Sequence, residues 1–232
     1  MLSNERHRQI ISYLEQKNTV TVQELTDILY ASSSTIRRDL SELEAQGFVK
    51  RIHGGAVLTA GSTFDTPASL RRTQQLAEKQ RIAELASQFL KPSSTYFFDS
   101  SSTASILATR LSDYPDVKIA TNGVAILSNM QSTDKLSILS TGGYLRSPWD
   151  ELTGNLAIKC IENMNADVFF FSCAGFTVEQ GAMELSDDNV SVKRVFYRNS
   201  KLRILLCDST NIGKLFFFKS FSISEIDYII TD

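Results

Sequence analysis

The 232-residue sequence predicts an α/β protein with two units, a small helical unit that ends in a β-hairpin and a larger α/β unit. Apolar residues recur at helical spacing in the first part of the chain, whereas short apolar runs alternate with helical stretches from residue 95 onward. Small and polar residues with Gly and Pro, over 59–67, separate the two patterns. The elements of each unit follow from these patterns in chain order.

Two helices are expected in the first part of the small unit. The first runs over 4–17, with Asn18 as a break after it, because its apolar residues repeat at helical spacing. Thr21 and Glu24 form a capping-box pattern, in which the hydroxyl and the carboxylate satisfy main-chain amides at a helix start. A short second helix therefore begins after Thr21.

The third helix has the most informative surface of the chain. Ser32 or Ser33 caps it, Gly47 ends it, and its apolar residues form one stripe. The opposite face has hydroxyl and guanidinium groups, which donate hydrogen bonds to phosphates and to guanine edges. The residues expected to contact DNA from this helix are Ser33, Ser34, Thr35, Arg37, Arg38 and Ser41.

A short basic hairpin follows the third helix. Strands are expected at 48–52 and 56–58, around a tight turn at His53-Gly54-Gly55. Three helices with such a hairpin make a winged helix-turn-helix. Residues 1–58 hold seven Lys or Arg and seven Asp or Glu, but Lys50, Arg51 and His53 gather beside the arginines of the third helix. We therefore predict DNA binding in preference to a helical bundle that only packs or dimerises.

The winged helix-turn-helix is expected over 3–58, with its helix-turn-helix motif at about 20–39. A linker and connecting helix follow over 59–90, and the helix runs over 68–90, where Pro92 ends it. The larger α/β domain is expected over 91–232. Apolar runs that are typical of strands buried on both faces lie at 96–98, 117–120, 137–139, 168–171, 204–207 and 228–230. Helices are expected between most of them, at 103–111, 124–130, 154–164 and 189–199. Strands that alternate with helices predict a parallel or mixed sheet with helices on both faces.

Ligands of such sheets bind beyond the carboxyl ends of the strands. The clearest candidate is Asp99-Ser100-Ser101-Ser102-Thr103, between the first strand and a helix, because helix-start amides with neighbouring hydroxyls can hold a phosphate. An ordinary helix cap needs only one hydroxyl, so the run favours an anion site. Asn122, Gly142 and Gly143 follow the next two strands, although each could equally belong to a plain turn, and Arg146 is a natural partner for an anion.

Two motifs of the first unit resemble a known family. These are Thr35-Ile36-Arg37-Arg38-Asp39-Leu40 and Lys50-Arg51-Ile52-His53-Gly54-Gly55-Ala56. They look like the DeoR-type bacterial transcriptional regulators, and the resemblance extends over essentially the whole chain. It implies a winged helix-turn-helix joined to a sugar-phosphate-sensing domain that is similar to ribose-5-phosphate isomerases and CoA-transferases. Such proteins usually repress carbohydrate operons.

The resemblance also implies effector-binding residues in the second unit. The matching positions include Asp99, Ser100, Thr103, Asn122, Gly142, Gly143, Arg146, Lys193 and Asp208. With Ser101 and Ser102 of the hydroxyl run and the nearby Lys214, they make up the expected effector-binding residues. Three positions depart from the family pattern. Ser101 replaces a glycine, Ala174 replaces an acidic residue, and Asn211 replaces a lysine for which Lys214 lies close by.

The composition fits a cytoplasmic protein, and the resemblance implies that this protein is bacterial and associates with the nucleoid. The net charge is −2, and no apolar run approaches the roughly 18 residues that cross a bilayer. The charged start of the chain is unlike a signal peptide. The three cysteines, Cys160, Cys173 and Cys207, form no CxxC motif and suit a reducing compartment as free thiols.

The alternative function is a sugar-phosphate isomerase or deaminase with an appended DNA-binding domain. Asp99, Lys193, Asp208 and Lys214 could supply acid–base chemistry for it. No histidine follows His53, and the chain has no GxGxxG and no P-loop, so we expect no catalytic residues, no metal and no cofactor. A purely structural oligomerisation domain is a third option. We predict a homo-oligomeric DNA-binding regulator with a small-molecule effector and no membrane partner.

Overall fold

The computed structural model describes residues 3–17, 19–45, 49–58, 68–147 and 149–232. The chain divides into two compact units, Met1–Leu70 and Arg71–Asp232. The helix ends expected at Asn18 and Gly47 fall outside the described residues. Within those residues, no helix has the length and apolar character that a membrane span requires.

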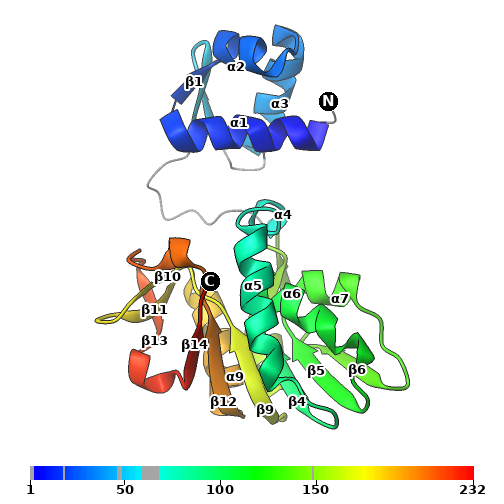
Figure 1. Cartoon of the computed structure of the whole chain (residues 1–232). Helices are drawn as coiled ribbons and strands as arrows, with labels where there is room; N and C mark the ends of the chain where they lie inside the picture. Colours follow the sequence, from blue (N-terminus) through cyan, green and yellow to red (C-terminus); the bar gives the residue numbers. More distant parts are fainter. Residues whose placement is uncertain (1–2, 18, 46–48, 59–67, 148) are drawn as a thin grey trace. The chain divides into compact units, whose positions relative to one another are not determined.

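The first unit is a winged helix-turn-helix, as the sequence predicts (Figure 1). Its elements are α1 (Ser3–Lys17), β1 (Thr19–Thr21), α2 (Val22–Leu29), α3 (Ser33–Ala45), β2 (Val49–Ile52) and β3 (Gly55–Leu58). The three strands form an antiparallel sheet in the order β1-β3-β2. The short strand β1 was not expected, and it enlarges the predicted hairpin into a three-stranded wing.

Local chemistry explains where these elements begin and turn. Thr21 and Glu24 form the expected capping box at the start of α2, with the Glu24 amide 3.1 Å from the Thr21 hydroxyl. The Ser32 hydroxyl accepts a hydrogen bond from the amide of Thr35 at 3.2 Å and so caps α3. At the hairpin turn, Gly54 has a φ of +80°, a left-handed conformation that favours glycine. A Cβ atom on Gly55 would lie 2.2 Å from the carbonyl oxygen of Val20, so β1 can approach only a glycine there.

The second unit is a parallel sheet of six strands in the order β14-β12-β9-β4-β5-β6. Its strands are β4 (Thr95–Phe98), β5 (Val117–Thr121), β6 (Leu136–Ser140), β9 (Ala166–Phe171), β12 (Ser200–Leu206) and β14 (Tyr228–Ile230). Each of the six apolar runs expected as a strand lies in this sheet. Its helices are α5 (Leu76–Ala86), α6 (Ser102–Thr109), α7 (Val124–Asn129), α8 (Asn155–Glu162) and α9 (Asp187–Arg198).

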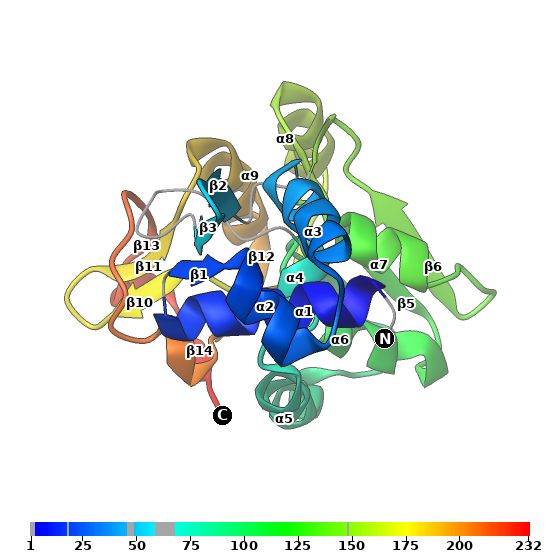
Figure 2. The ribbon, with the colours of Figure 1, turned by 90° about the horizontal axis from the view of Figure 1, so that it is seen from above.

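Aromatic side chains alternate between the two faces of this sheet. Tyr96 and Phe98 pack in one core with residues of α5 and α6, while Phe97 packs in a second core with residues of α8 and α9. Seen from above, α8 and α9 lie on the opposite side of the strands from α5 and α6 (Figure 2). The strands are therefore buried on both faces, as their continuous apolar runs predict.

Two smaller sheets were not expected. A hairpin of β7 (Tyr144–Arg146) and β8 (Glu151–Thr153) follows β6. A three-stranded sheet joins β10 (Gly175–Thr177), β11 (Gly181–Glu184) and β13 (Phe218–Phe221). These strands have no apolar run or clear alternation, so the sequence gives little signal for them.

The single helix expected over 68–90 is interrupted. The structure has α4 (Ala68–Arg71), a turn, and then α5, with Gln75 in the left-handed region at a φ of 48°. The buried Lys79 ammonium stabilises the turn, because it donates to the carbonyl oxygens of Arg71 at 2.5 Å and Gln74 at 2.8 Å. After the turn, α5 packs in the core of the second unit through Ile82 and its neighbours.

Candidate functional sites

The outer face of α3 is exposed as the sequence predicts. Ile36, Leu40 and Leu43 are buried, whereas Ser33, Ser34, Arg37 and Arg38 are exposed and Thr35 is half-buried. The side chain of Arg38 is 82% exposed, and it forms a 3.2 Å ion pair with Glu42 one turn away. Exposed pairs of this kind contribute about 0–1 kcal/mol, so the guanidinium is readily released to a DNA base or phosphate.

The wing places Lys50, Arg51 and His53 on the surface. Arg51 also has a role that the sequence did not reveal. Its Nε lies 2.6 Å from Glu44 Oε2, and its Nη1 donates to the Ser41 hydroxyl at 2.8 Å. Arg51 therefore links the wing to the last turns of α3. This contact involves Ser41 as well, so both residues hold α3 and the wing in register.

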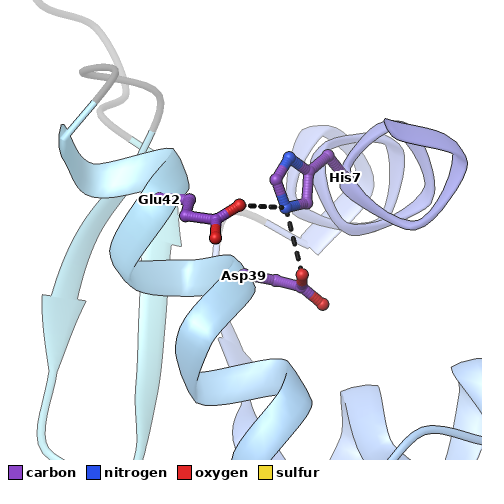
Figure 3. Close-up of side chains that lie close together, drawn as sticks. All are labelled: His7, Asp39 and Glu42. Carbon is purple, nitrogen blue, oxygen red and sulfur yellow. Dashed lines mark hydrogen bonds and ion pairs between the residues drawn. The ribbon is translucent and has the colours of Figure 1, made fainter. Parts of the chain in front are cut away.

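A buried ion-pair network lies beneath α3, and the sequence analysis missed it. Asp39 is 2% exposed and accepts hydrogen bonds from Arg6 of α1, at 2.5 Å from Nε and 2.9 Å from Nη2. The hydrogen bond to Asp39 raises the pKa of Arg6 above its ordinary value. Figure 3 shows His7, also of α1, between Asp39 and Glu42, with Nε2 at 3.1 Å and 3.6 Å from the two carboxylates.

His7, Asp39 and Glu42 are side chains of the types that bind metal ions. The Arg6 guanidinium, however, already bonds both oxygens of Asp39 and supplies the compensating positive charge. The network is therefore a salt-bridged joint that fixes α3 on α1. It has no local sequence signature, because its members come from two helices far apart in the chain.

The turn between α2 and α3 displays a second feature that the sequence did not reveal. Tyr30 is 96% exposed and has a φ of 51°, a left-handed conformation that is costly for an aromatic residue. It lies three residues before the hydroxyl-rich start of α3 at Ser33. The exposed ring thus borders the predicted DNA-contacting face.

In the second unit, the candidate ligand site lies where the strand order reverses. From β4 the chain continues through β5 and β6 in one direction, and β9, β12 and β14 follow on the other side of β4. Open α/β sheets bind ligands at such a switch point, beyond the carboxyl ends of the strands. The loop Asp99–Thr103 follows β4 at this point, and Asn122 follows the adjacent strand β5. We call this region the strand-end site.

Asp99 organises the loop with both of its carboxylate oxygens. Its Oδ1 accepts hydrogen bonds from the amide of Ser101 at 3.0 Å and from the hydroxyl of Ser101 at 2.5 Å. Its Oδ2 accepts from the amide of Ser172 at 2.9 Å and lies 3.0 Å from Lys193 Nζ. Ser101 also caps α6 through the amide of Ala104, and its φ of −72° requires no glycine. The Ser101 departure from the family pattern therefore suits this loop.

Lys193 lies at the centre of a buried cluster. Its Nζ is 3.0 Å from Asp99 Oδ2, 2.5 Å from Glu184 Oε1 and 2.7 Å from the carbonyl oxygen of Ser172. Burial alone would lower the pKa of Lys193, but the two carboxylates outweigh it and raise the pKa. The sequence analysis named Asp99 and Lys193 among the same site residues, and the two side chains are in contact in the structure, but it missed Glu184. With 3% exposure, Lys193 is buried among these groups and supports the loop.

A second polar cluster surrounds Glu151 at the start of β8. This buried carboxylate accepts a hydrogen bond from the Ser100 hydroxyl at 3.2 Å and another from the side-chain amide of Asn189. The Arg146 guanidinium lies 3.4 Å from Glu151 and 3.4 Å from Asp188, and it also donates to the Ser186 hydroxyl. Arg146 is thus held at the rim of the site by several partly exposed contacts.

Two buried acceptors in this region lack a donor. The Oδ1 atoms of Asn122 and Asn189 have no hydrogen-bond partner within the described part of the chain, although Asn122 Nδ2 donates to the carbonyl oxygen of Leu152 at 3.2 Å. Buried polar atoms almost always find a partner in proteins, in the form of a protein group, water or ligand. These two acceptors therefore suit the hydroxyl groups of a ligand or a bridging water.

The other expected site residues have different surroundings. Gly142, with a φ of +63°, is exposed, while Gly143 allows close packing, because a Cβ there would lie 2.4 Å from the Thr153 carbonyl oxygen. Asp208 is buried after β12 and accepts hydrogen bonds from Thr210. Lys214 is exposed and belongs to neither polar cluster. Asn211 donates to the Cys173 carbonyl oxygen at 3.2 Å, so it packs the loop that follows β12.

A winged helix-turn-helix with exposed arginines on α3, followed by a separate α/β unit, is the architecture of a DNA-binding protein with a second, ligand-binding type of domain. The family model of the DeoR-like helix-turn-helix domain matches residues 6–61. The family model of the DeoR C terminal sensor domain matches residues 74–232. The chain belongs to the DeoR family of transcriptional regulators.

Curated relatives cover the whole chain and are regulators rather than enzymes. The HTH-type transcriptional regulator GolR of Listeria innocua is 35% identical over 100% of this chain and 91% of its own length. The glycerol-3-phosphate regulon repressor of Escherichia coli is 30% identical over 100% of this chain and 92% of its own. A putative aga operon transcriptional repressor of Escherichia coli O157:H7 is 28% identical, over 99% of this chain and 86% of its own.

Solved structures with a partial likeness include a ribose 5-phosphate isomerase A from Methanocaldococcus jannaschii. It has 14% sequence identity and a TM-score of 0.40, covering 59% of this chain and 54% of its own. The eIF2B delta subunit of Chaetomium thermophilum has 13% identity and a TM-score of 0.47, covering 86% of this chain and 63% of its own.

Proposed function

We propose that the protein represses a carbohydrate-utilisation operon and that a phosphorylated sugar or related metabolite, bound at the strand-end site, changes its affinity for operator DNA. The names of two relatives, which refer to glycerol 3-phosphate and to the aga operon, support this class of effector. The observation that carries the proposal is the pre-organised loop Asp99–Thr103 at the sheet's switch point, beside two buried acceptors. A homo-oligomer on repeated half-sites would supply operator-level affinity.

The chemistry of the site suits both halves of such a ligand. The Ser101 hydroxyl caps the third amide of α6, that of Ala104. The two amides before it, those of Ser102 and Thr103, can therefore donate hydrogen bonds to an anion at the helix start. The side-chain carbonyl oxygens (Oδ1) of Asn122 and Asn189 can accept hydrogen bonds from sugar hydroxyls. Arg146 can exchange its contacts with Glu151 and Asp188 for a phosphate.

A thermal-shift screen tests the effector. We expect at least one of glycerol 3-phosphate, fructose 1-phosphate, glucose 6-phosphate and galactosamine 6-phosphate to raise the melting temperature of the full chain. Ser102→Ala removes the hydroxyl that lies beside the helix-start amides, and Asn122→Ala removes one of the two acceptors. Each variant should weaken binding of that ligand by about tenfold, as loss of one or two hydrogen bonds predicts. The exposed Asn129→Ala on α7 is the matched control. A ligand that stabilises all variants equally would place the pocket elsewhere, and no response to any sugar phosphate would contradict the proposal.

Operator binding tests the DNA interface. Arg38→Ala should weaken binding by about 1–3 kcal/mol and relax specificity at one base pair, because Arg38 is expected to bond a base edge. Lys50→Ala should instead weaken all sequences alike and reduce the salt dependence of binding, because its partner is expected to be a phosphate. Titrations of a selected operator and of single-base variants of it, at several salt concentrations, measure both effects. If Arg37→Ala and Arg38→Ala together leave the affinity unchanged, α3 is not the recognition helix.

A further inference from the structure

We infer that Arg71 and Arg72 couple the strand-end site to the chain segment that leads to the DNA-binding unit, which is an inference about regulation that rests on the function proposed above. These arginines begin the second unit. Arg71 Nη2 donates to the carbonyl oxygen of Trp149 at 3.1 Å, and Arg72 Nη1 lies 2.9 Å from Asp150 Oδ2. We call these two contacts the latch.

The loop that the latch holds also belongs to the strand-end site. Trp149 and Asp150 lie between Arg146 and Glu151 in the sequence, and the guanidinium of Arg146 stacks on the Trp149 ring at 4.7 Å. The carbonyl oxygen of Asp150 accepts a hydrogen bond from Val124 at 2.9 Å, just beyond Asn122. One short loop therefore touches the ligand-facing groups on one side and the start of the unit on the other.

The latch and the turn that follows Arg72 contain residues in unfavourable local conformations. Asp150 and Gln75 have φ values of 54° and 48°, a left-handed conformation that is costly for residues other than glycine. The Nε of Arg71 and the Nε1 of Trp149 are buried without an acceptor among the residues that the structure describes. Unpartnered donors and backbone strain reduce the stability of the observed arrangement, so another arrangement can lie close to it in free energy.

Lys79 connects the latch rigidly to the segment before α5. Its buried ammonium donates to the carbonyl oxygens of Arg71 and Gln74, and burial lowers its pKa. A displacement of Arg71 is therefore passed to the whole turn 71–75. Helix α5 does not move with this displacement, because Ile82 and Ala83 fix α5 in the core of the unit.

The direction of coupling follows from charge. An anionic ligand attracts Arg146 away from Glu151 and Asp188, which lie 3.4 Å from it, and from the Ser186 hydroxyl, to which it also donates. Because Trp149 stacks on that guanidinium, the loop and its contacts with Arg71 and Arg72 shift with it. The ligand changes DNA affinity only as far as it prefers one state of the latch to the other.

A double-mutant cycle on the full chain tests the latch without any effector. The measured quantity is affinity for an operator selected from random DNA with the unmodified chain. The change of affinity in the double variant Arg72→Ala, Arg146→Ala should differ by more than about threefold from the product of the two single-variant changes. This is expected because both residues act through one loop. The exposed Arg81→Ala on α5 is the matched control and should combine multiplicatively with Arg146→Ala. Multiplicative effects of Arg72→Ala and Arg146→Ala would overturn the inference.

A charge swap separates this inference from the proposed function. Arg72→Asp should abolish the response of operator affinity to glycerol 3-phosphate or another stabilising sugar phosphate, and adding Asp150→Arg should restore it. An unchanged response in Arg72→Asp would overturn the latch and leave the effector proposal intact. If no sugar phosphate binds but the cycle is non-multiplicative, the latch stands and the proposed effector class fails.

Discussion

Lys193→Met is expected to lower the free energy of unfolding of the second unit by about 3–5 kcal/mol, the usual cost of removing one partner from a buried ion pair. The substitution would leave the carboxylates of Asp99 and Glu184 buried without their cation. Because a domain of this kind has a net stability of about 5–15 kcal/mol, the loss is a large share of it. Hydrogen exchange of the β4 and β9 amides, measured in the full chain at increasing urea concentrations, gives the free energy of unfolding of this unit.

Lys201→Met is the matched control for that prediction. The Lys201 side chain is 81% exposed and lies 2.9 Å from Asp167, so its loss should cost about 0–1 kcal/mol. Combining Lys193→Met with Glu184→Gln should recover part of the stability, because one of the two stranded carboxylates is removed. If Lys193→Met costs no more than Lys201→Met, the buried cluster does not stabilise the unit. Lost ligand binding in a Lys193 variant must therefore be compared with its stability.

The sheet could be predicted because its strands are buried on both faces. A run such as Tyr96-Phe97-Phe98 is apolar without alternation, which distinguishes it from an amphipathic helix or a surface strand. The hairpin β7–β8 lacks that signal, since Tyr144 and Leu145 are exposed. The break between α4 and α5 had no local signal either, because it depends on Lys79 bonding two carbonyl oxygens earlier in the chain.

The candidate ligand site could be located from the sequence, but the roles of its residues could not. The run of hydroxyls after β4 indicated an anion site. Two of those hydroxyls are used internally, because Ser100 donates to Glu151 and Ser101 donates to Asp99. The partners Glu151 and Glu184 come from later strands, and only the folded chain brings them to Ser100 and Lys193. Pairings of this kind depend on tertiary structure, which local patterns do not encode.

Asp39→Ala is expected to destabilise the first unit by about 3–5 kcal/mol and to abolish operator binding, since it leaves the Arg6 guanidinium without its carboxylate partner. The Arg6 side chain is only 12% exposed, so water cannot fully replace Asp39. A small domain buries little surface and has little stability to lose, so α3 would no longer be held for DNA. Hydrogen exchange of the α1 and α3 amides in the full chain, with an operator titration, measures both effects.

Two further variants determine whether the Arg6–Asp39 pair is the cause. Asp27→Ala, at an exposed position of α2 that accepts a hydrogen bond from Gln23, should change stability by less than about 0.5 kcal/mol. Arg6→Leu combined with Asp39→Leu should recover much of the stability, because an apolar pair can replace a buried ion pair without leaving a charge unpartnered. Normal exchange protection and operator affinity in Asp39→Ala would show that the joint between α1 and α3 does not depend on this carboxylate. Recovery in the double variant, with DNA binding restored, would show that Asp39 acts by positioning α3 and does not itself contact DNA.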